Sequence, residues 1–205
     1  GGTSAAAAAV TLGVLAGAES VDTDDGSVLT LNVAEAREFY MAGIVIDNGY
    51  AIVDGGPEVM GASQSMLAGA VSITVEDVTV DEAMGLVSLQ NVPGVDNLDF
   101  SIADGESLAD LSGVQALAAI EATNVVAGDV SVKDSASWIG QASQVDFNAF
   151  GGVTATTDAD QDLTSIGNLA DLVDTIELNG SVTLTVEQAG LEVIGGGSYN
   201  VVDGA

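Results

Sequence analysis

The sequence predicts a β-rich repeat protein, a parallel β-solenoid in which short helices or helical turns connect the strands. Three observations lead to this prediction. Similar pairs of segments recur in the same order along the chain, and each segment changes from strand-like to helix-like composition within a few residues. The chain is also 47% hydrophobic but only 4% aromatic. Its core must therefore consist of small aliphatic side chains, which suit closely stacked repeats.

Each repeat has a first and a second half. The first half is a run such as Val182-Thr-Leu-Thr-Val-Glu-Gln-Ala189, and the second half is a run such as Tyr199-Asn-Val-Val-Asp-Gly204. Similar pairs occur at residues 29–36 with 49–55 and at residues 78–83 with 98–105. Recurrence of both halves in the same order is the signature of a repeat architecture.

The first half predicts a strand that continues into a short helix, because β-branched residues alternate with period two before Glu, Gln and Ala follow. The second half predicts a strand that ends at an aspartate. Apolar residues at helical spacing follow several such aspartates, so we expect each aspartate to be the N-cap of the next helix. These aspartates are Asp54, Asp104, Asp134 and Asp158.

Strands that return in the same direction after such connections pair in parallel, with a period of roughly 20 to 30 residues. In a solenoid, each coil buries its apolar positions against its neighbours. A compact α/β sandwich of the same elements is the alternative architecture.

We expect two regions in the chain. Residues 1–27 form an apolar N-terminal segment and an acidic turn, and residues 28–205 form the repeat domain. The apolar run Ala5–Ala18 is too short to span a bilayer. We expect this run to be a buried first helix or a packed N-terminal arm, or alternatively a segment that docks into a neighbouring subunit.

The charge of the chain excludes several functions. Arg37 and Lys133 are the only basic residues, no His or Cys is present, and 31 acidic residues give a formal net charge of -29. General-base imidazoles, thiolates and cationic phosphate clamps are therefore absent. Binding to nucleic acid or to an anionic membrane is also disfavoured. The carboxylates instead suggest counterions such as calcium, or high ionic strength.

A candidate metal site comprises Asp158, Asp160 and Asp162. Oxygen ligands at alternate positions are how an EF-hand loop begins, but Leu163 and Leu169 stand where that loop needs Gly and Glu. The segment is therefore not an EF-hand. A calcium site of another kind and a solvated, N-capped corner both fit it.

A second candidate metal site comprises Asp22, Asp24 and Asp25, in a turn that ends at Gly26. Three neighbouring carboxylates repel one another unless a cation lies among them. A calcium site and an ordinary acidic loop are the two interpretations of this segment.

Other chemistries find little support in the sequence. No nucleotide-binding P-loop and no Gly-x-Ser-x-Gly elbow occurs, and a serine triad has no His. Carboxylate pairs such as Glu76 with Asp77, or Asp81 with Glu82, lack the aromatic platforms typical of glycosidases. The single tryptophan, Trp138, lies at helical spacing after Asp134 and is expected in the core or at a subunit contact.

The repeat units resemble the low-complexity β-strand repeats of large bacterial secreted proteins, which include surface-layer, adhesin and haemolysin-type proteins. The resemblance rests on residues 100–111, 130–139, 182–189 and 199–204. It implies one-step secretion and an extracellular location. The calcium-binding nonapeptide Gly-Gly-x-Gly-x-Asp of the haemolysin-type roll does not occur, because Ser198 and Tyr199 follow the glycines at 195–197.

These observations predict a non-enzymatic structural protein that assembles with copies of itself into an extracellular array, sheath or filament on a prokaryotic cell surface. Calcium is the expected bridging cation. The alternative is an adhesion or calcium-binding module of a larger secreted surface protein, which binds a receptor or glycan. A halophile's protein would explain the acidity but not the repeats.

Overall fold

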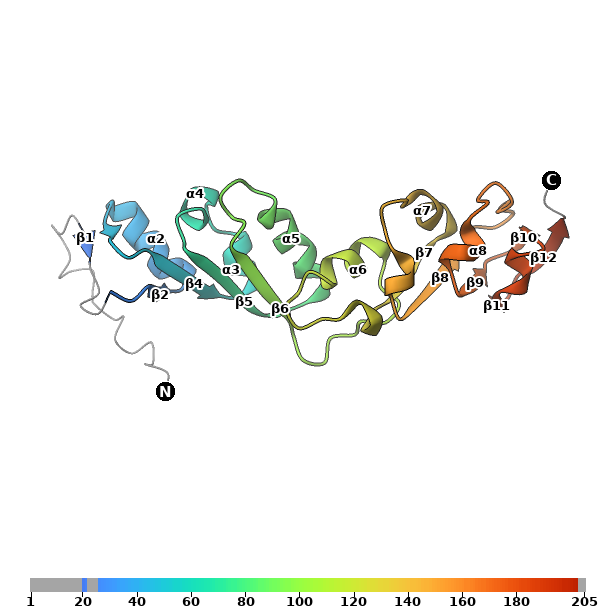
Figure 1. The fold of residues 1–205 in the computed structure, drawn as a ribbon, viewed down its shortest axis with the longest axis horizontal. Coiled ribbons are helices and arrows are strands. Elements are labelled where there is room, and N and C mark those ends of the chain that lie inside the picture. The colour runs from blue at the N-terminus through green and yellow to red at the C-terminus, as the bar shows by residue number, and fades with distance from the viewer. Residues whose placement is uncertain (1–19, 22–25, 203–205) are drawn as a thin grey trace. The chain divides into compact units, whose positions relative to one another are not determined.

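The computed structural model describes residues 20–21 and 26–202 of the 205-residue chain. Its contacts divide the chain into two units, Gly1–Asp104 and Gly105–Ala205. Both units consist of short parallel strands that alternate with helices (Figure 1).

Unit 1 contains a four-stranded parallel sheet and a separate pair of short strands. Its elements are β1 (Ser20–Val21), β2 (Leu29–Leu31), α2 (Val33–Ala42), β3 (Val45–Ile46), β4 (Tyr50–Asp54), α3 (Gly56–Met60), α4 (Gln64–Leu67), β5 (Ser72–Val78), α5 (Val80–Gln90) and β6 (Leu98–Ile102). The sheet order is β2-β4-β5-β6, and β1 pairs with β3. Helices α2, α3 and α5 pack against β4, β5 and β6 respectively.

Unit 2 also contains one four-stranded parallel sheet and one separate pair. Its elements are α6 (Gly113–Ala119), the 3-10 turn η2 (Ala127–Asp129), β7 (Ser131–Ser135), α7 (Ala136–Gln141), η3 (Phe147–Ala149), β8 (Gly152–Thr156), α8 (Leu169–Leu172), β9 (Thr175–Leu178), β10 (Ser181–Thr185), η4 (Gln188–Gly190), β11 (Glu192–Gly195) and β12 (Ser198–Val202). The sheet order is β11-β9-β8-β7, and β10 pairs with β12.

The strands stack at a nearly constant spacing in sequence. In the pairs β2–β4, β4–β5, β7–β8 and β8–β9, each residue lies opposite the residue 21 positions later, as Leu29 does with Tyr50 and Ser131 with Gly152. The spacing lengthens where the 11-residue helix α5 connects β5 to β6. It shortens to 17 where Ser181 lies opposite Ser198, because the connection contains only the three-residue turn η4 and the short strand β11.

The β-solenoid prediction is wrong. The described residues form a mixed α/β fold with seven α-helices and several short parallel sheets, which fits the alternative of an α/β arrangement of the same elements. The expected helical turns include full helices of 10 and 11 residues, α2 and α5. Reciprocal capping boxes start three of the helices, and these pair Asn32 with Glu35, Thr79 with Glu82, and Ser112 with Gln115.

The strand-end aspartates do not cap their own helices as N-cap residues. The N-caps after Asp54 and Asp134 are Gly55 and Ser135, whereas Asp104 and Asp158 lead into turns. The Asp54 carboxylate accepts the amides of Gly55, at 2.9 Å, and of Val33, at 2.8 Å. Val33 is the first residue of α2, 21 residues earlier, so the carboxylate caps the helix of the preceding repeat.

Asp134 repeats this arrangement in unit 2. Its carboxylate accepts the amide of Ser135 at 2.6 Å and that of Gly113, the first residue of α6, at 2.9 Å. Parallel stacking places each strand end beside the helix start of the repeat before it. A single carboxylate therefore satisfies orphan amides of two consecutive repeats.

The core of each unit lies between its sheet and its helices. In unit 1, Ile52, Ile73, Val75 and Phe100 point from successive strands toward the helices and are fully or almost fully buried. In unit 2 the same role belongs to Val132, Val153, Ala155 and Ile176. None of the helices formed by the described residues is long and apolar enough to cross a membrane.

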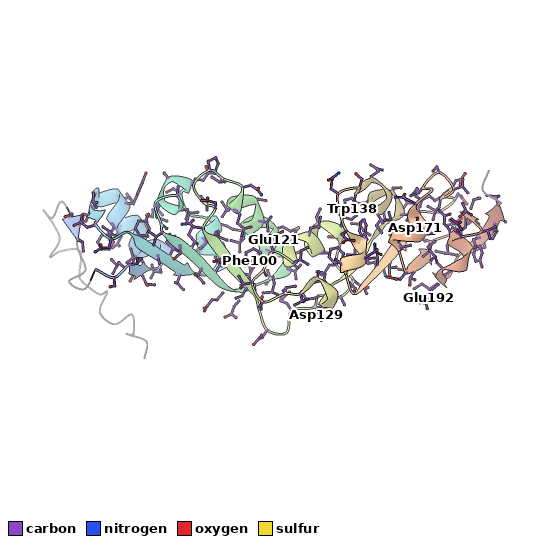
Figure 2. All side chains as sticks on the ribbon, in the orientation of Figure 1. Phe100, Glu121, Asp129, Trp138, Asp171 and Glu192 are labelled. Atoms are coloured by element: carbon purple, nitrogen blue, oxygen red, sulfur yellow. The ribbon has the colours of Figure 1, made fainter. Side chains whose placement is uncertain are left out.

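Glycines allow successive helices to approach closely. An added Cβ at Gly85 in α5 would overlap the Met60 side chain of α3, and one at Gly140 in α7 would overlap Ile166. At Gly113, the first residue of α6, an added Cβ would overlap the indole ring of Trp138 in α7. Trp138 also makes an edge-to-face contact with Phe147, at a centroid distance of 6.1 Å. Its ring therefore lies between two repeats of unit 2, where Figure 2 labels it.

We expect Gly113→Ala to lower the free energy of unfolding by about 1–3 kcal/mol, because the added methyl group overlaps the Trp138 ring. Urea denaturation of the purified chain measures the change. Gly128→Ala is the matched control, since nothing lies within 4 Å of a Cβ at that position. Equal stability of the two variants would contradict close packing of Trp138 on Gly113.

We expect Asp134→Asn to destabilise the protein by about 1–2 kcal/mol, because Asn keeps one acceptor oxygen and its NH2 group cannot accept, so one of the two backbone amides loses its partner. Asp129→Asn, at an exposed position, is the control and should be nearly neutral. Hydrogen exchange at Gly113 adds a local measurement. Unchanged protection of that amide in Asp134→Asn would argue against capping between repeats.

Candidate functional site

The strand β12 forms an open edge in unit 2. All five of its residues are exposed, and β10 is its only strand partner among the described residues. The pairing is in register over all five positions, from Ser181 with Ser198 to Thr185 with Val202. In Figure 1 this strand lies beside β10.

Backbone hydrogen bonds show which groups of β12 point outward. The amide of Ser198 donates to the carbonyl of Gly180 at 2.9 Å, so Ser198, Asn200 and Val202 face β10. Successive residues of a strand turn their backbone groups to opposite sides. The amides and carbonyls of Tyr199 and Val201 therefore point away from β10, where a further strand would pair.

The side chains of Tyr199 and Val201 continue a column of the core. Their partners in the register are Val182 and Leu184, which are 2% and 0% exposed. Tyr199 and Val201 are 44% and 48% exposed, because no described strand follows β12. These two residues hold core positions that no strand of the described chain covers.

Exposed apolar side chains concentrate near both ends of the described chain. Thirteen large apolar side chains are exposed among these residues, and nine of them fall within residues 28–45 and 186–202. The nine are Val28, Tyr40, Met41, Val45, Val186, Ile194, Tyr199, Val201 and Val202. An exposed apolar strand edge is a site for adding another strand, and β12 contains no Pro or charged residue that would block such addition.

The metal site expected at Asp22, Asp24 and Asp25 lies outside the described residues. Asp158, Asp160 and Asp162 are described, and all three are exposed in the connection between β8 and α8. Across the described part of the chain, no group of three or more acidic side chains is arranged to hold a metal ion. The calcium site at these residues remains a prediction.

Asp162 has a defined structural contact. Its Oδ1 atom accepts the amide of Thr164 at 3.0 Å and the hydroxyl of Thr164 at 2.7 Å. These two bonds favour the charged carboxylate, so they lower the pKa of Asp162 below its ordinary value. The turn also places the preceding Asp160 in the left-handed region, with φ of 60°.

Two grooves are lined by carboxylates from segments that are distant in the sequence. In unit 1, a groove of 390 Å³ is lined by Asp54, Glu76, Asp77 and Glu82, among others. Asp54 and Glu82 already accept backbone amides in caps. Their carboxylates are therefore structural groups rather than free ligands.

The second groove, of 540 Å³, lies in unit 2. Its lining includes Phe147, Phe150, Asp171, Asp174 and Glu192, and Figure 2 labels Asp171 and Glu192. These carboxylates come from α8, from the residue before β9 and from β11. Sequence reasoning missed this group because its members approach one another only through the stacking of repeats.

The two basic residues have different environments. The Nζ atom of Lys133 lies 2.6 Å from a carboxylate oxygen of Glu177, so an ion pair spans strand β8 between β7 and β9. The hydrogen bond from Glu177 raises the pKa of Lys133 above its ordinary value. Arg37 is exposed on α2 and lines a groove of 230 Å³ with Ser63 and Met66.

A small pocket of 260 Å³ in unit 1 is mainly apolar. Its lining includes Phe39, Tyr40, Ile44 and Tyr50. The Tyr50 hydroxyl donates to the carbonyl of Met66 at 2.5 Å. Burial and the neighbouring Tyr40 raise the pKa of Tyr50, so this phenol is a structural donor at neutral pH.

No family model, curated protein or solved structure shows a significant match to the chain.

We expect the pKa of Asp162 to rise in Thr164→Val, because the substitution removes the hydroxyl that donates to the carboxylate. NMR titration of the Asp162 carboxyl carbon measures this change. Since the pKa is lower in the folded than in the unfolded protein, the stabilisation is present above about pH 4 and is lost as the pH falls through the folded-state pKa. Thr154→Val, a change of the same kind on β8, is the control. An unchanged Asp162 titration in Thr164→Val would rule out the hydroxyl contact.

Proposed function

We propose that the chain is a non-enzymatic structural protein that assembles with copies of itself into an extracellular array, sheath or filament of a prokaryotic cell surface, with divalent cations between the copies. The outer edge of β12 is the observation that carries the proposal. Its outward amides at Tyr199 and Val201, and its apolar side chains, offer an unprotected edge for a strand of another copy.

The charge supports a role for cations in this assembly. A net charge of -29 makes copies repel one another at low salt. Calcium binds carboxylate oxygens and neutralises charge without needing a preformed site of several carboxylates in one copy, because ligands from two copies complete its shell. Monovalent salt screens the same repulsion more weakly at equal concentration.

The composition supports a non-enzymatic role. Imidazole and thiol groups are absent from the sequence, and several groove carboxylates serve as helix caps. The resemblance to secreted bacterial surface repeats is the basis for proposing an extracellular location.

An adhesion module is the second candidate. It is favoured by the 540 Å³ groove of unit 2, which combines phenylalanine side chains with the carboxylates of Asp171 and Glu192. The third carboxylate of this groove, Asp174, accepts the backbone amide of Val153 at 2.9 Å and is a structural group. Such a combination suits a glycan, through apolar contact and hydrogen bonds to hydroxyl groups, or a calcium-bridged receptor.

The test is assembly of the purified chain, followed by sedimentation velocity and negative-stain electron microscopy. Samples contain millimolar calcium, calcium plus chelator, or sodium chloride at matched ionic strength. We expect ordered polymers with calcium and their loss with chelator, because bridging removes repulsion that screening alone leaves in place.

The other outcomes discriminate between the candidates. Polymers that resist the chelator would keep self-assembly and remove the cation bridge. Monodisperse particles in every condition would refute self-assembly. If glycans then shift the NMR signals of Asp171 and Glu192, the adhesion role gains support.

A further inference from the structure

We propose that copies of this chain join head to tail, with the outer edge of β12 in one copy pairing in parallel with the outer edge of β2 in the next. This inference rests on the proposed self-assembly and names the two surfaces that would carry it. The partner of β12 is thus a second copy of the same chain, not an unrelated strand.

The edge of β12 has the same backbone pattern that interior strands present to the strand that follows them. In β10, the register and the Ser198–Gly180 bond direct the backbone groups of Val182 and Leu184 toward β12. These are core residues. In β12 the outward backbone groups belong to Tyr199 and Val201, the residues at the corresponding core positions.

The outer edge of β2 has the opposite pattern. It is the backbone pattern that an interior strand presents to the strand before it. The amide of Leu29 donates to the carbonyl of Gly49, so Leu29 and Leu31 face β4 and the backbone groups of Thr30 point outward. Thr30 is exposed, and β4 is the only strand partner of β2 in the described part of the chain. Its side chain lies on the solvent side of the strand.

Interior pairs combine these two patterns. Thr183 of β10 lies on the solvent side of its strand, between two core residues. Its amide donates to the carbonyl of Gln161, and its carbonyl accepts the amide of Leu163, so both groups bond to the preceding segment. In β5 the core residue Ile73 donates forward to Asn97. The backbone groups of core residues therefore bond forward, to the next strand, and those of solvent-side residues bond backward, to the preceding strand.

This rule decides the geometry of the contact. The β12 edge presents forward-bonding core residues and the β2 edge presents a backward-bonding solvent-side residue, so the two edges complement each other as consecutive repeats do. An antiparallel pair of two β12 edges would also place core positions beside core positions, but it would be a kind of pairing that no two described strands adopt. All strand pairs in the described chain are parallel.

The side chains agree with this pairing. Parallel addition would place Leu29 and Leu31 of the incoming copy beside Tyr199 and Val201, which would extend the apolar column. Neither β2 nor β12 contains a charged residue. The joint therefore brings no carboxylates of the edge strands together, in spite of the net charge of the chain.

The experiment uses one variant that blocks each edge. Val201→Pro removes an outward amide of β12 without removing a bond to β10, and Thr30→Pro does the same for β2. Each variant, and an equimolar mixture of the two, is studied by sedimentation velocity under the conditions in which the unmodified chain assembles. Circular dichroism and thermal melting confirm that each variant is folded.

We expect each variant alone to remain monomeric. In the mixture, Thr30→Pro still offers its β12 edge and Val201→Pro still offers its β2 edge. The mixture should therefore form dimers of one copy each, and nothing larger. This complementation distinguishes a head-to-tail joint from any contact between like edges.

Other results overturn the inference. If Thr30→Pro dimerises alone while Val201→Pro does not, two β12 edges pair with each other. If both variants polymerise like the unmodified chain, neither edge forms the joint and only the proposed self-assembly survives. If the unmodified chain itself stays monomeric in every condition, the proposed function fails together with this assignment.

A second pair of variants tests the same edges in case the proline variants do not fold. Val201→Glu and Thr30→Glu place a negative charge at each edge and keep the backbone donor, and Val126→Glu introduces the same charge at a position 66% exposed in unit 2. The two edge variants should raise the critical concentration for assembly at least tenfold. Val126→Glu should leave it within twofold, and equal effects of all three would refute the edge assignment.

Discussion

The parallel backbone ladder between consecutive repeats is the constraint on which both units depend. A strand such as β4 or β9 is stable only because it has a neighbour on each side and exchanges hydrogen bonds, as donor and as acceptor, with both. Each strand contributes few residues, and no strand pair is a hairpin that forms locally. Stability is therefore shared between neighbouring strands, and the hydrogen-bond ladder is incomplete at the first and last strand of each sheet.

The spacing of about one strand per 21 residues is maintained by contacts between adjacent repeats. The carboxylates of Asp54 and Asp134 each bond to an amide 21 residues earlier. Glycines such as Gly113 leave room for a large side chain of the next repeat. A change in either kind of contact acts on two repeats at once, because the residues in contact are distant in sequence but adjacent in the stack. The Lys133–Glu177 ion pair extends this linkage across a third strand.

The sequence was sufficient to predict what depends on local pattern. Alternating β-branched residues identified short strands, and their recurrence implied parallel pairing. The length of the connections was misjudged, because helix formers after a strand fit a single turn as well as a full helix. The pairs Asn32 with Glu35 and Thr79 with Glu82 are readable capping boxes that would have favoured full helices. The roles of Asp54 and of the Asp171 groove needed the register between repeats, which composition does not specify. For Asp162 the sequence left a calcium site and a solvated corner open, and its bonds to Thr164 depend on a turn conformation that the sequence does not specify.

The negative charge of the chain and the open edge of β12 are compatible because electrostatic repulsion acts over a longer distance than the pairing of strands. Carboxylates on the surface repel other copies over roughly a Debye length, about 10 Å at 0.1 M salt. Backbone hydrogen bonds and apolar contact act only when strands meet. In the proposed assembly, the uncharged edge of β12 would stay apart from other copies at low ionic strength and would pair once cations reduce the repulsion. The surface charge would then control when copies approach, and the edge would determine how they join. With 31 acidic and 2 basic residues, such an assembly would depend strongly on ionic conditions.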